Sequence, residues 1–186
     1  DETWSVDTES KLLAGQTVRL ERGFMELRLL NGIVVVIEGP AEFTLTSTVK
    51  GVLEYGGLAV RVPPGEEGYV VDTPTARLTD LGTEFAVVVG SSGDEVHVLD
   101  GQVRLEPRAG TLPAAGAGLV RTLRIGQALR TDLSGSTRLV GARPVEFLGR
   151  QRLAELASRE STNRVAKWQA YRAELEADQG VLLNYG

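Results

Sequence analysis

Few side chains in this 186-residue chain are suited to chemistry. There is one histidine, His97, and no cysteine, which excludes thiolate nucleophiles, disulfides and zinc–thiolate sites. A histidine that acts as a general base needs a nucleophile within hydrogen-bond reach, and the sequence identifies none. Because Val96 and Val98 flank His97 in an alternating segment, we expect its ring on the solvent side of a strand, beside Arg104.

Carboxylates are the other candidates, and four are spaced along the middle of the chain: Asp72, Asp80, Glu84 and Asp100. Glycosidases use two such groups, one on either side of the scissile bond. A polysaccharide lyase needs a basic cluster with acidic metal ligands, for which Arg77 and Asp80 are the available residues. All four except Glu84 are at turn-like positions, where aspartate caps backbone amides. We therefore interpret them as structural and predict that the protein is not an enzyme.

Residues 132–136, Asp-Leu-Ser-Gly-Ser, have a weak likeness to an oxygen-ligand loop. They lack the third acidic ligand and the distal glutamate that an EF-hand uses to hold calcium. The segment is therefore interpreted as an ordinary turn. We predict no catalytic residue, no metal site and no cofactor.

Composition excludes several classes of partner. The net charge is -5, from 20 basic and 25 acidic residues, which disfavours general nucleic-acid binding, so we expect no nucleic-acid partner. No apolar run approaches the ~20 residues of a membrane-spanning helix, so we expect no direct membrane contact by this segment. Aromatic residues make up 5% of the chain, which is low for a sugar-binding surface of stacked rings. The sequence starts at Asp1 without an initiator methionine or signal peptide, and we interpret it as a piece of a longer protein.

The elements that must position these residues are β-strands. From residue 16 onward, short apolar runs alternate with glycine and proline punctuation. Residues 33–37 are apolar at every position, so we expect this strand to be covered on both faces. Phe85, Val87 and Val89 recur with period two and are expected to form a second main contribution to the core.

Two dipeptides predict tight two-residue hairpins, Asn31-Gly32 and Asp100-Gly101. The resulting registers place these residues opposite one another: Leu29 and Val34, Leu27 and Val36, Leu30 and Ile33, Arg28 and Val35, Val98 and Val103, and Val96 and Leu105.

The character of the chain changes at Pro144. Residues 146–178 are rich in Ala, Leu, Glu and Arg, and they carry an apolar stripe at helical spacing formed by Val165, Trp168, Tyr171 and Leu175. One long helix or two shorter ones are predicted, packing on the β unit or on a following domain, or docking a partner. We divide the chain into an N-terminal extension (1–15), a β domain (16–141), a helical linker (142–180) and the start of a following domain (181–186).

A set of short motifs runs through the β region in a fixed order. They are Gly39-Pro40-Ala41-Glu42-Phe43, Val62-Pro63, Asp72-Thr73-Pro74, Asp80-Leu81-Gly82-Thr83-Glu84-Phe85, Val96-His97-Val98-Leu99-Asp100-Gly101-Gln102-Val103 and Gly126-Gln127-Ala128. Together they resemble the FecR-type domain, over about residues 16–132, in the variant of planctomycete-like bacteria. In that variant the domain often lies outside an inner-membrane helix and ahead of a lectin-like sandwich.

The resemblance implies a non-enzymatic signalling module. Such a module is periplasmic, is tethered to the inner membrane in the full-length protein, and relays an envelope signal toward a cytoplasmic sigma factor. The implied partner is a protein, either the signalling domain of an outer-membrane transporter or a neighbouring domain of the same chain. The alternatives are a carbohydrate-binding or adhesion module coupled to a lectin-like domain, and an enzyme of the glycosidase or lyase class.

We predict an all-β fold with a long C-terminal helical segment. Short strands at regular spacing suit a sandwich, a barrel or an irregular solenoid, and no strict sequence repeat is visible. The resemblance inclines the prediction toward the solenoid-like form, in which the two hairpins decorate stacked turns.

The motif at residues 80–85 has two interpretations. In the structural one, Asp80 caps backbone amides, Gly82 takes a positive φ and Phe85 enters the core. In the functional one, Thr83 and Glu84 form part of a partner surface. Pro74 is expected to keep Thr73 extended and so to end a strand. The motif residues carried forward as structural or partner-facing are Gly39, Pro40, Thr73, Pro74, Asp80, Gly82, Thr83, Glu84, Phe85, Asp100 and Gly101.

Overall fold

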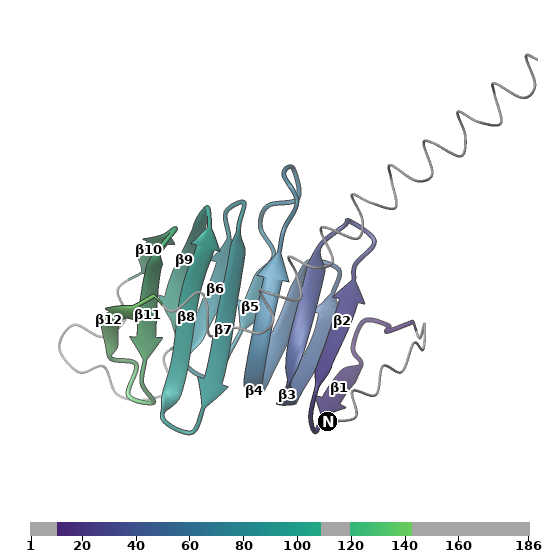
Figure 1. Ribbon diagram of the computed structural model, residues 1–186, viewed down its shortest axis with the longest axis horizontal. Helices are drawn as coiled ribbons and strands as arrows, with labels where there is room; N and C mark the ends of the chain where they lie inside the picture. The colour runs from purple at the N-terminus through teal and green to yellow at the C-terminus, as the bar shows by residue number, and fades with distance from the viewer. Residues whose placement is uncertain (1–10, 109–119, 143–186) are drawn as a thin grey trace, which may run out of the picture. The chain divides into compact units, whose positions relative to one another are not determined.

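The computed structural model describes residues 11–108 and 120–142, and every regular element in these ranges is a β-strand (Figure 1). The all-β prediction is thus confirmed for this part of the chain. The predicted helical segment at 146–178 and the tail at 181–186 lie outside the described residues. The strands are β1 (Thr17–Leu20), β2 (Phe24–Arg28), β3 (Val34–Ser47), β4 (Lys50–Arg61), β5 (Val70–Asp72), β6 (Ala76–Asp80), β7 (Glu84–Gly90), β8 (Gly93–Asp100), β9 (Gln102–Pro107), β10 (Arg121–Arg124), β11 (Gln127–Thr131) and β12 (Thr137–Gly141).

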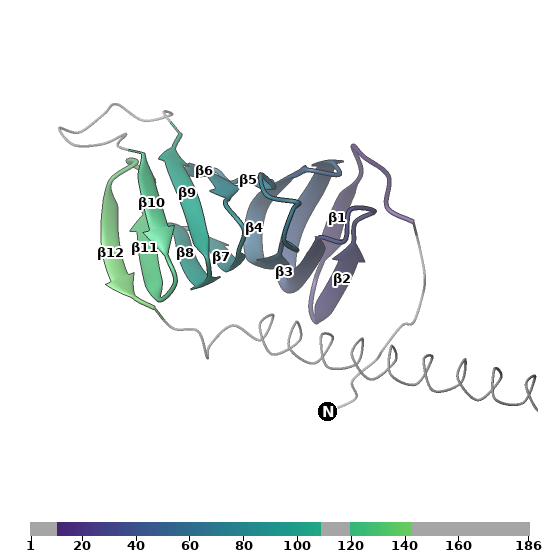
Figure 2. The same ribbon diagram turned by 90° about the horizontal axis from the view of Figure 1, so that it is seen from above.

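All these strands belong to one sheet, which folds back on itself along β3 and β4. These two long strands pair with each other over two stretches, 34–38 with 57–61 and 42–47 with 50–55, separated by register shifts. The second stretch continues into β1, β5, β6, β9 and β10, which we call half I, and the first continues into β2, β7, β8, β11 and β12, which we call half II. Figure 2 shows how the sheet curves around so that the two halves face each other.

The arrangement is a curled half-barrel. Of the eleven strand pairings among the described residues, only that of β4 with β5 is parallel. A solenoid stacks its coils as parallel strands, so the inclination toward a solenoid-like form is not confirmed; of the alternatives, the barrel is nearest to this single curled sheet.

Glycine is required where the sheet folds. At Gly56, which has a φ of +101°, an added Cβ would lie 2.4 Å from the backbone oxygen of Pro40. At Gly39 an added Cβ would lie 2.8 Å from the backbone nitrogen of Arg22. The first family motif, Gly39-Pro40, therefore serves the close approach of chains at this bend.

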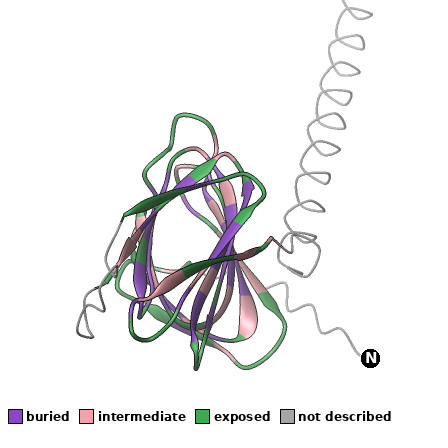
Figure 3. Ribbon diagram, turned by 90° about the vertical axis from the view of Figure 1, so that its left-hand side faces the viewer, coloured by how far each residue is buried: buried purple, intermediate pink, exposed green. Residues whose placement is uncertain are grey.

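The core fills the space between the two halves. Phe85 and Val87 are fully buried and Val89 is 6% exposed, which confirms the predicted core strand. In the run 33–37 only Val34 is half-buried, and Val36 is buried although it faces the opposite side from Val35. This burial confirms that the strand is covered on both faces. In Figure 3 the buried residues lie along the strands, and the exposed ones lie in the turns and on outer strands such as β10 and β12.

The first predicted hairpin exists, but its register is shifted by one residue. The amide of Leu29 donates to the carbonyl of Ile33 at 2.9 Å, and Leu27 lies opposite Val35. The loop therefore holds three residues, 30–32. A two-residue type I′ turn needs positive φ at both central positions, whereas here Gly32 has φ +83° and Asn31 does not have a positive φ.

The second predicted hairpin is wrong. Strand β8 pairs with β7 and β11, and β9 pairs with β6 and β10, so the turn at Asp100-Gly101 carries the chain from half II to half I. Val98 lies opposite Phe85, and Leu105 lies opposite Leu78. The Asp-Gly pair fixes a tight turn, but nothing local decides which half the chain joins after it.

Candidate functional site

The loops at one end of the folded sheet contact each other in an unbroken series. We call this the loop end; it comprises loops 30–32, 48–49, 62–69, 81–83, 100–101 and 125–126, at the top of Figure 1. The Asn31 side chain donates to the carbonyl of Thr48 at 3.4 Å, and the amide of Val62 donates to the carbonyl of Thr83 at 2.9 Å. The amide of Ile125 in turn donates to the carbonyl of Gly101 at 3.0 Å.

Two of the family motifs meet at this end. A Cβ on Gly101 would lie 2.0 Å from the carbonyl oxygen of Gly82 and 2.9 Å from Cγ2 of Thr83, so the two turns are in direct contact. The structure thus brings together seven of the predicted residues, Asp80, Gly82, Thr83, Glu84, Phe85, Asp100 and Gly101. It separates them from Gly39 and Pro40 at the bend and from Thr73 and Pro74 at the opposite end of the sheet.

The turn at residues 80–85 has the predicted structural form. The Asp80 carboxylate accepts a hydrogen bond from the amide of Gly82 at 3.0 Å, Gly82 has φ +87°, and Phe85 is fully buried. The amide of Gly101 likewise donates to the Asp100 carboxylate at 3.0 Å. Capping by these two aspartates is therefore confirmed.

The complete burial of Asp80 was not predicted from the sequence. Its side chain shares the inner face of half I with Val103, and burial raises the pKa of Asp80 to about 6, although backbone amides including that of Gly82 oppose the shift. Its Oδ1 atom has no hydrogen-bond partner among the described residues, and neither has Oγ1 of Thr83. Thr83 is itself buried, so Glu84, which is half-buried, is the member of the pair that reaches solvent.

Four apolar side chains project from the loop end, each from a different loop. The exposed fractions are 98% for Leu30, 53% for Val49, 46% for Leu81 and 61% for Ile125. Sequence reasoning missed them because each looks like the end of a strand. One sequence signal was available: a large apolar residue directly before a glycine that forms a turn, as in Leu81-Gly82 and Ile125-Gly126.

Acidic residues lie in the two loops that contact the turn of Leu81. Glu66 and Glu67 lie in the loop between β4 and β5, and Asp100 lies in the turn that touches Gly82; all three are exposed. The Glu67 carboxylate accepts a hydrogen bond from the amide of Gly65 at 3.0 Å, and such backbone donors lower its pKa. Two arginines are nearby. Arg61 of β4 lies opposite Glu84 on the adjacent strand β7, and Arg124 directly precedes Ile125.

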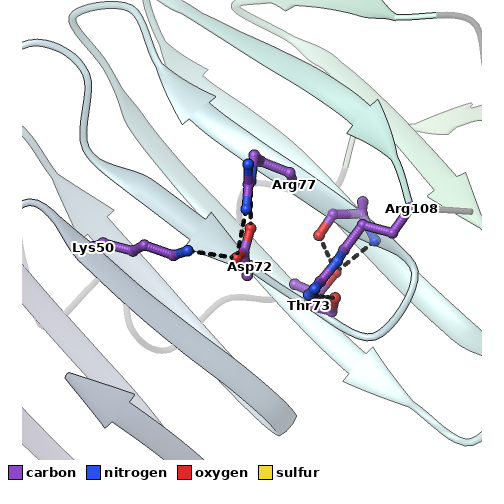
Figure 4. Close-up of polar contacts among 6 residues, drawn as sticks. Lys50, Asp72, Thr73, Arg77 and Arg108 are labelled. Carbon is purple, nitrogen blue, oxygen red and sulfur yellow. Dashed lines mark hydrogen bonds and ion pairs between the residues drawn. The ribbon is translucent and has the colours of Figure 1, made fainter. Parts of the chain in front are cut away.

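At the opposite end of the sheet, charged groups are paired. Asp72 accepts two hydrogen bonds from Arg77, at 2.7 and 3.0 Å, and it forms an ion pair with Lys50 at 2.9 Å (Figure 4). The Asp72 side chain is 4% exposed, and these bonds, led by those of Arg77, lower its pKa to about 2. The Asp72 carboxylate bonds to the side chains of Arg77 and Lys50, which corrects the expectation that it caps the backbone amides of a turn.

The neighbouring turn binds the two halves together. Thr73 ends β5 as predicted, and the hydroxyls of Thr73 and Thr75 bond to the buried carboxylate of Asp94 in β8, the latter at 2.5 Å. Arg108 donates to the carbonyl of Thr73 at 3.2 Å (Figure 4). We call Thr73, Thr75 and Asp94 the polar clamp, because it links half I to half II across the interior.

His97 is not on the surface. It is 1% exposed, it lies between Ala86 of β7 and Ala128 of β11, and its Nε2 is 2.8 Å from Oε1 of Glu95. Arg104 is on the other half, opposite Thr79. The expected neighbour Arg104 came from the incorrect hairpin, and the expected exposure came from the alternation with the two flanking valines. Strand β8 is an interior strand, so its second face is also covered at His97.

The other candidate sites can be placed as well. Residues 132–136 form the turn between β11 and β12, in which the Asp132 carboxylate accepts bonds from the amides of Ser134 and Ser136, so the ordinary-turn interpretation is confirmed. Arg77 bonds to Asp72 and lies on the outer face of half I, whereas Asp80 faces the interior, so the residues suggested for a lyase are not brought together. In ranges 11–108 and 120–142 no three His, Cys, Asp or Glu side chains are grouped to hold a metal ion, and no helix is long and apolar enough to cross a membrane.

These motifs and this sheet agree with a known family. Residues 17–104 match the family described as FecR protein. Over these residues the chain is similar to FecR proteins. The match contains both motifs of the loop end and stops before Gly126-Gln127-Ala128.

The fold of this chain has solved counterparts. Two crystal structures of a candidate anti-sigma factor from Parabacteroides distasonis are similar to the chain, with TM-scores of 0.57 and 0.54 and sequence identities of 16% and 17%. Each alignment covers 68% of this chain and 60% of the other, so the chain spans less than two thirds of the length of those proteins. At this identity the likeness is one of fold. No curated protein matches the chain.

Proposed function

We propose that this FecR-like domain is a non-enzymatic, protein-binding module of a regulator that relays an envelope signal toward a sigma factor. The observation that carries the proposal is the FecR match over residues 17–104. The anti-sigma factor of similar fold supports it as a likeness of architecture. The domain would act by shape and contact, because the buried charged groups of the polar clamp and of the Asp72 cluster are engaged in structural bonds.

The proposed location is the periplasm, with the full-length protein tethered to the inner membrane by another segment. The proposed partner is a protein, either the signalling domain of a transporter or another domain of the same polypeptide. A carbohydrate-binding role stays an alternative prediction, which a glycan array with the purified domain would test.

The regulatory role is tested in the native host by deleting residues 17–104 in frame from the full-length protein. We expect transcripts that depend on one alternative sigma factor to change several-fold, and the change to vanish when that sigma factor is also deleted. Unchanged sigma-dependent transcription, with the shortened protein present at its normal level, would reject the proposal.

The location is tested with a single introduced thiol. Since this chain has no cysteine, Ser91→Cys in the exposed turn between β7 and β8 adds its only thiol. A maleimide that crosses the outer but not the inner membrane should label this variant in intact cells. Labelling that appears only after lysis would place the domain in the cytoplasm instead.

A further inference from the structure

We propose that the loop end is the docking surface of the domain, and that it binds a protein segment in which apolar residues flank basic ones. The inference rests on the proposed function as a protein-binding module and specifies where binding occurs and the chemistry of the partner.

The first argument is the gathering of apolar side chains. Single exposed apolar residues are ordinary on protein surfaces, but a group of them at one place marks an interaction site. Leu30 and Val49 form one pair, because their loops are joined by the bond from Asn31 to Thr48. Leu81 and Ile125 form a second pair: the amide of Leu81 donates to the carbonyl of Gln102 at 3.0 Å, and that of Ile125 donates to the adjacent turn.

The second argument is that the loops are held in place before any partner arrives. The long loop 62–69 is fastened at both ends, by the bond from the amide of Val62 to Thr83 and by that from the amide of Gly68 to the carbonyl of Asp80 at 3.1 Å. Figure 1 shows this loop rising above its neighbours at the top of the sheet. A surface fixed by backbone hydrogen bonds loses little conformational entropy on binding, which favours affinity.

The third argument is charge. Glu66 and Glu67 belong to the loop that contacts both apolar pairs, since an added Cβ on Gly32 would lie 3.5 Å from Pro63 and one on Gly82 would lie 3.4 Å from Glu67. Asp100 adds an exposed carboxylate next to Leu81. A complementary segment therefore carries lysine or arginine opposite this loop and apolar anchors on either side. Arg61 and Arg124 are also exposed at this end, so it is the local charge of loop 62–69, with Glu66 and Glu67, that disfavours an anionic lipid surface and favours a protein segment.

The test begins with the full-length protein in its native host. A photo-crosslinking amino acid is placed at Leu30 or Leu81, and, as a matched control, at Leu139, which is 63% exposed on β12 away from these loops. We expect one protein to be crosslinked from both loop positions and not from Leu139, through a peptide with basic and apolar residues. Crosslinks that are absent, that are equal at Leu139, or that fall on an acidic or uncharged peptide would overturn the proposal.

The crosslinked peptide is then synthesised and titrated against the purified full-length protein. The double variant Leu30→Asp/Leu81→Asp should weaken binding about tenfold or more, and Leu139→Asp should leave it unchanged. Glu66→Gln/Glu67→Gln should weaken it about threefold and flatten its salt dependence. Equal binding by all variants would refute the assignment, as would stronger binding to phosphatidylglycerol vesicles that Leu30→Asp/Leu81→Asp abolishes.

The transcriptional assay separates the two proposals. If deletion of residues 17–104 alters sigma-dependent transcription but Leu30→Asp/Leu81→Asp signals normally, the docking surface is elsewhere and the regulatory function stands. If the deletion has no effect, the proposed function itself fails. All substituted side chains are exposed, so an unchanged thermal unfolding midpoint confirms that each variant is folded.

Discussion

Each end of the sheet contains a buried aspartate, and the pKa values of the two are shifted in opposite directions. Asp72 is surrounded by Arg77 and Lys50, and its pKa falls to about 2. Asp80 is completely buried near the loop end with backbone amides as its donors, and its pKa rises to about 6. In the first case partners compensate for the removal of charge from water, and in the second they do not.

The contrast extends to the surroundings of each aspartate. Beside Asp72 the polar clamp fastens the two halves with hydrogen bonds to Asp94. Around Asp80 the buried atoms Asp80 Oδ1 and Thr83 Oγ1 lack partners among the described residues, and apolar side chains project into solvent. In the polar clamp Oδ1 of Asp94 also lacks such a partner, but its Oδ2 accepts from both threonine hydroxyls of the clamp and from the Thr75 amide. Groups that are costly to stability concentrate where a protein binds something, so the difference suggests that one end holds the domain together while the other recognises.

The largest expected effect is on the packing beneath the loop end. Phe85→Ala should lower the free energy of unfolding by about 3–5 kcal/mol, because the ring is fully buried and leaves a cavity. Urea unfolding measures the loss, with Leu139→Ala as an exposed control. A loss below about 1 kcal/mol would mean that the core is loosely packed beneath the loop end. The two ends of the sheet would then differ in their packing rather than in how they pair buried polar groups.

The next effect is at the polar clamp. Asp94→Ala should cost about 2–4 kcal/mol, since the hydroxyls of Thr73 and Thr75 lose their common acceptor inside the protein. Asp132→Ala, in an exposed turn, removes a carboxylate with similar local bonds and should cost less than about 1 kcal/mol. Equal losses would show that the clamp adds nothing beyond an ordinary turn.

The raised pKa of Asp80 predicts that the free energy of unfolding falls as the pH rises. Its folded pKa of about 6 exceeds the usual value of 3.8, so its contribution is fully present below pH 3.8 and is lost as the pH rises through 6. Between pH 4 and 7 the wild type should lose about 2 kcal/mol relative to Asp80→Asn. Parallel stability profiles for the two proteins would indicate that water reaches the carboxylate.

Gly82 tests the backbone of the same turn. Gly82→Val should destabilise by about 1–2 kcal/mol, because the residue has φ +87° and β-branched side chains rarely adopt that conformation. An added Cβ would meet only the flexible Glu67 side chain, at 3.4 Å, so the loss would come from the backbone and not from a clash. Wild-type stability in chemical denaturation would contradict the turn geometry.

Asp72 predicts the smallest effect, and it has the opposite sign to that of Asp80. Because its folded pKa of about 2 is below 3.8, its contribution is present above pH 3.8 and disappears as the pH falls toward 2. The wild type should lose about 1 kcal/mol relative to Asp72→Asn over this interval, a value reduced by the partial exposure of Lys50 and Arg77. A profile with the same sign as that of Asp80 would break the comparison.

Local features of the fold could be predicted, and non-local ones could not. The turn at Asp80–Phe85 and the core position of Phe85 follow from residue type, because positive φ and apolar alternation are properties of neighbouring residues. The path after Asp100-Gly101 depends on which half offers a free strand edge, and the burial of His97 depends on the interior position of β8 between β7 and β11. The loop end escaped prediction for the same reason, since its apolar residues come from four separate loops.

The sharing of β4 between the halves has a further consequence. Its first residues, Lys50–Val52 in the pairing with β5, belong to half I, and its last residues pair with β7 in half II. Together with β3 it forms a long hairpin of sequence-local contacts, which can assemble early and offer free edges to both halves at once. Neither half can then unfold without breaking hydrogen bonds of β3 and β4 that also support the other half. We therefore expect the domain to unfold as one cooperative unit.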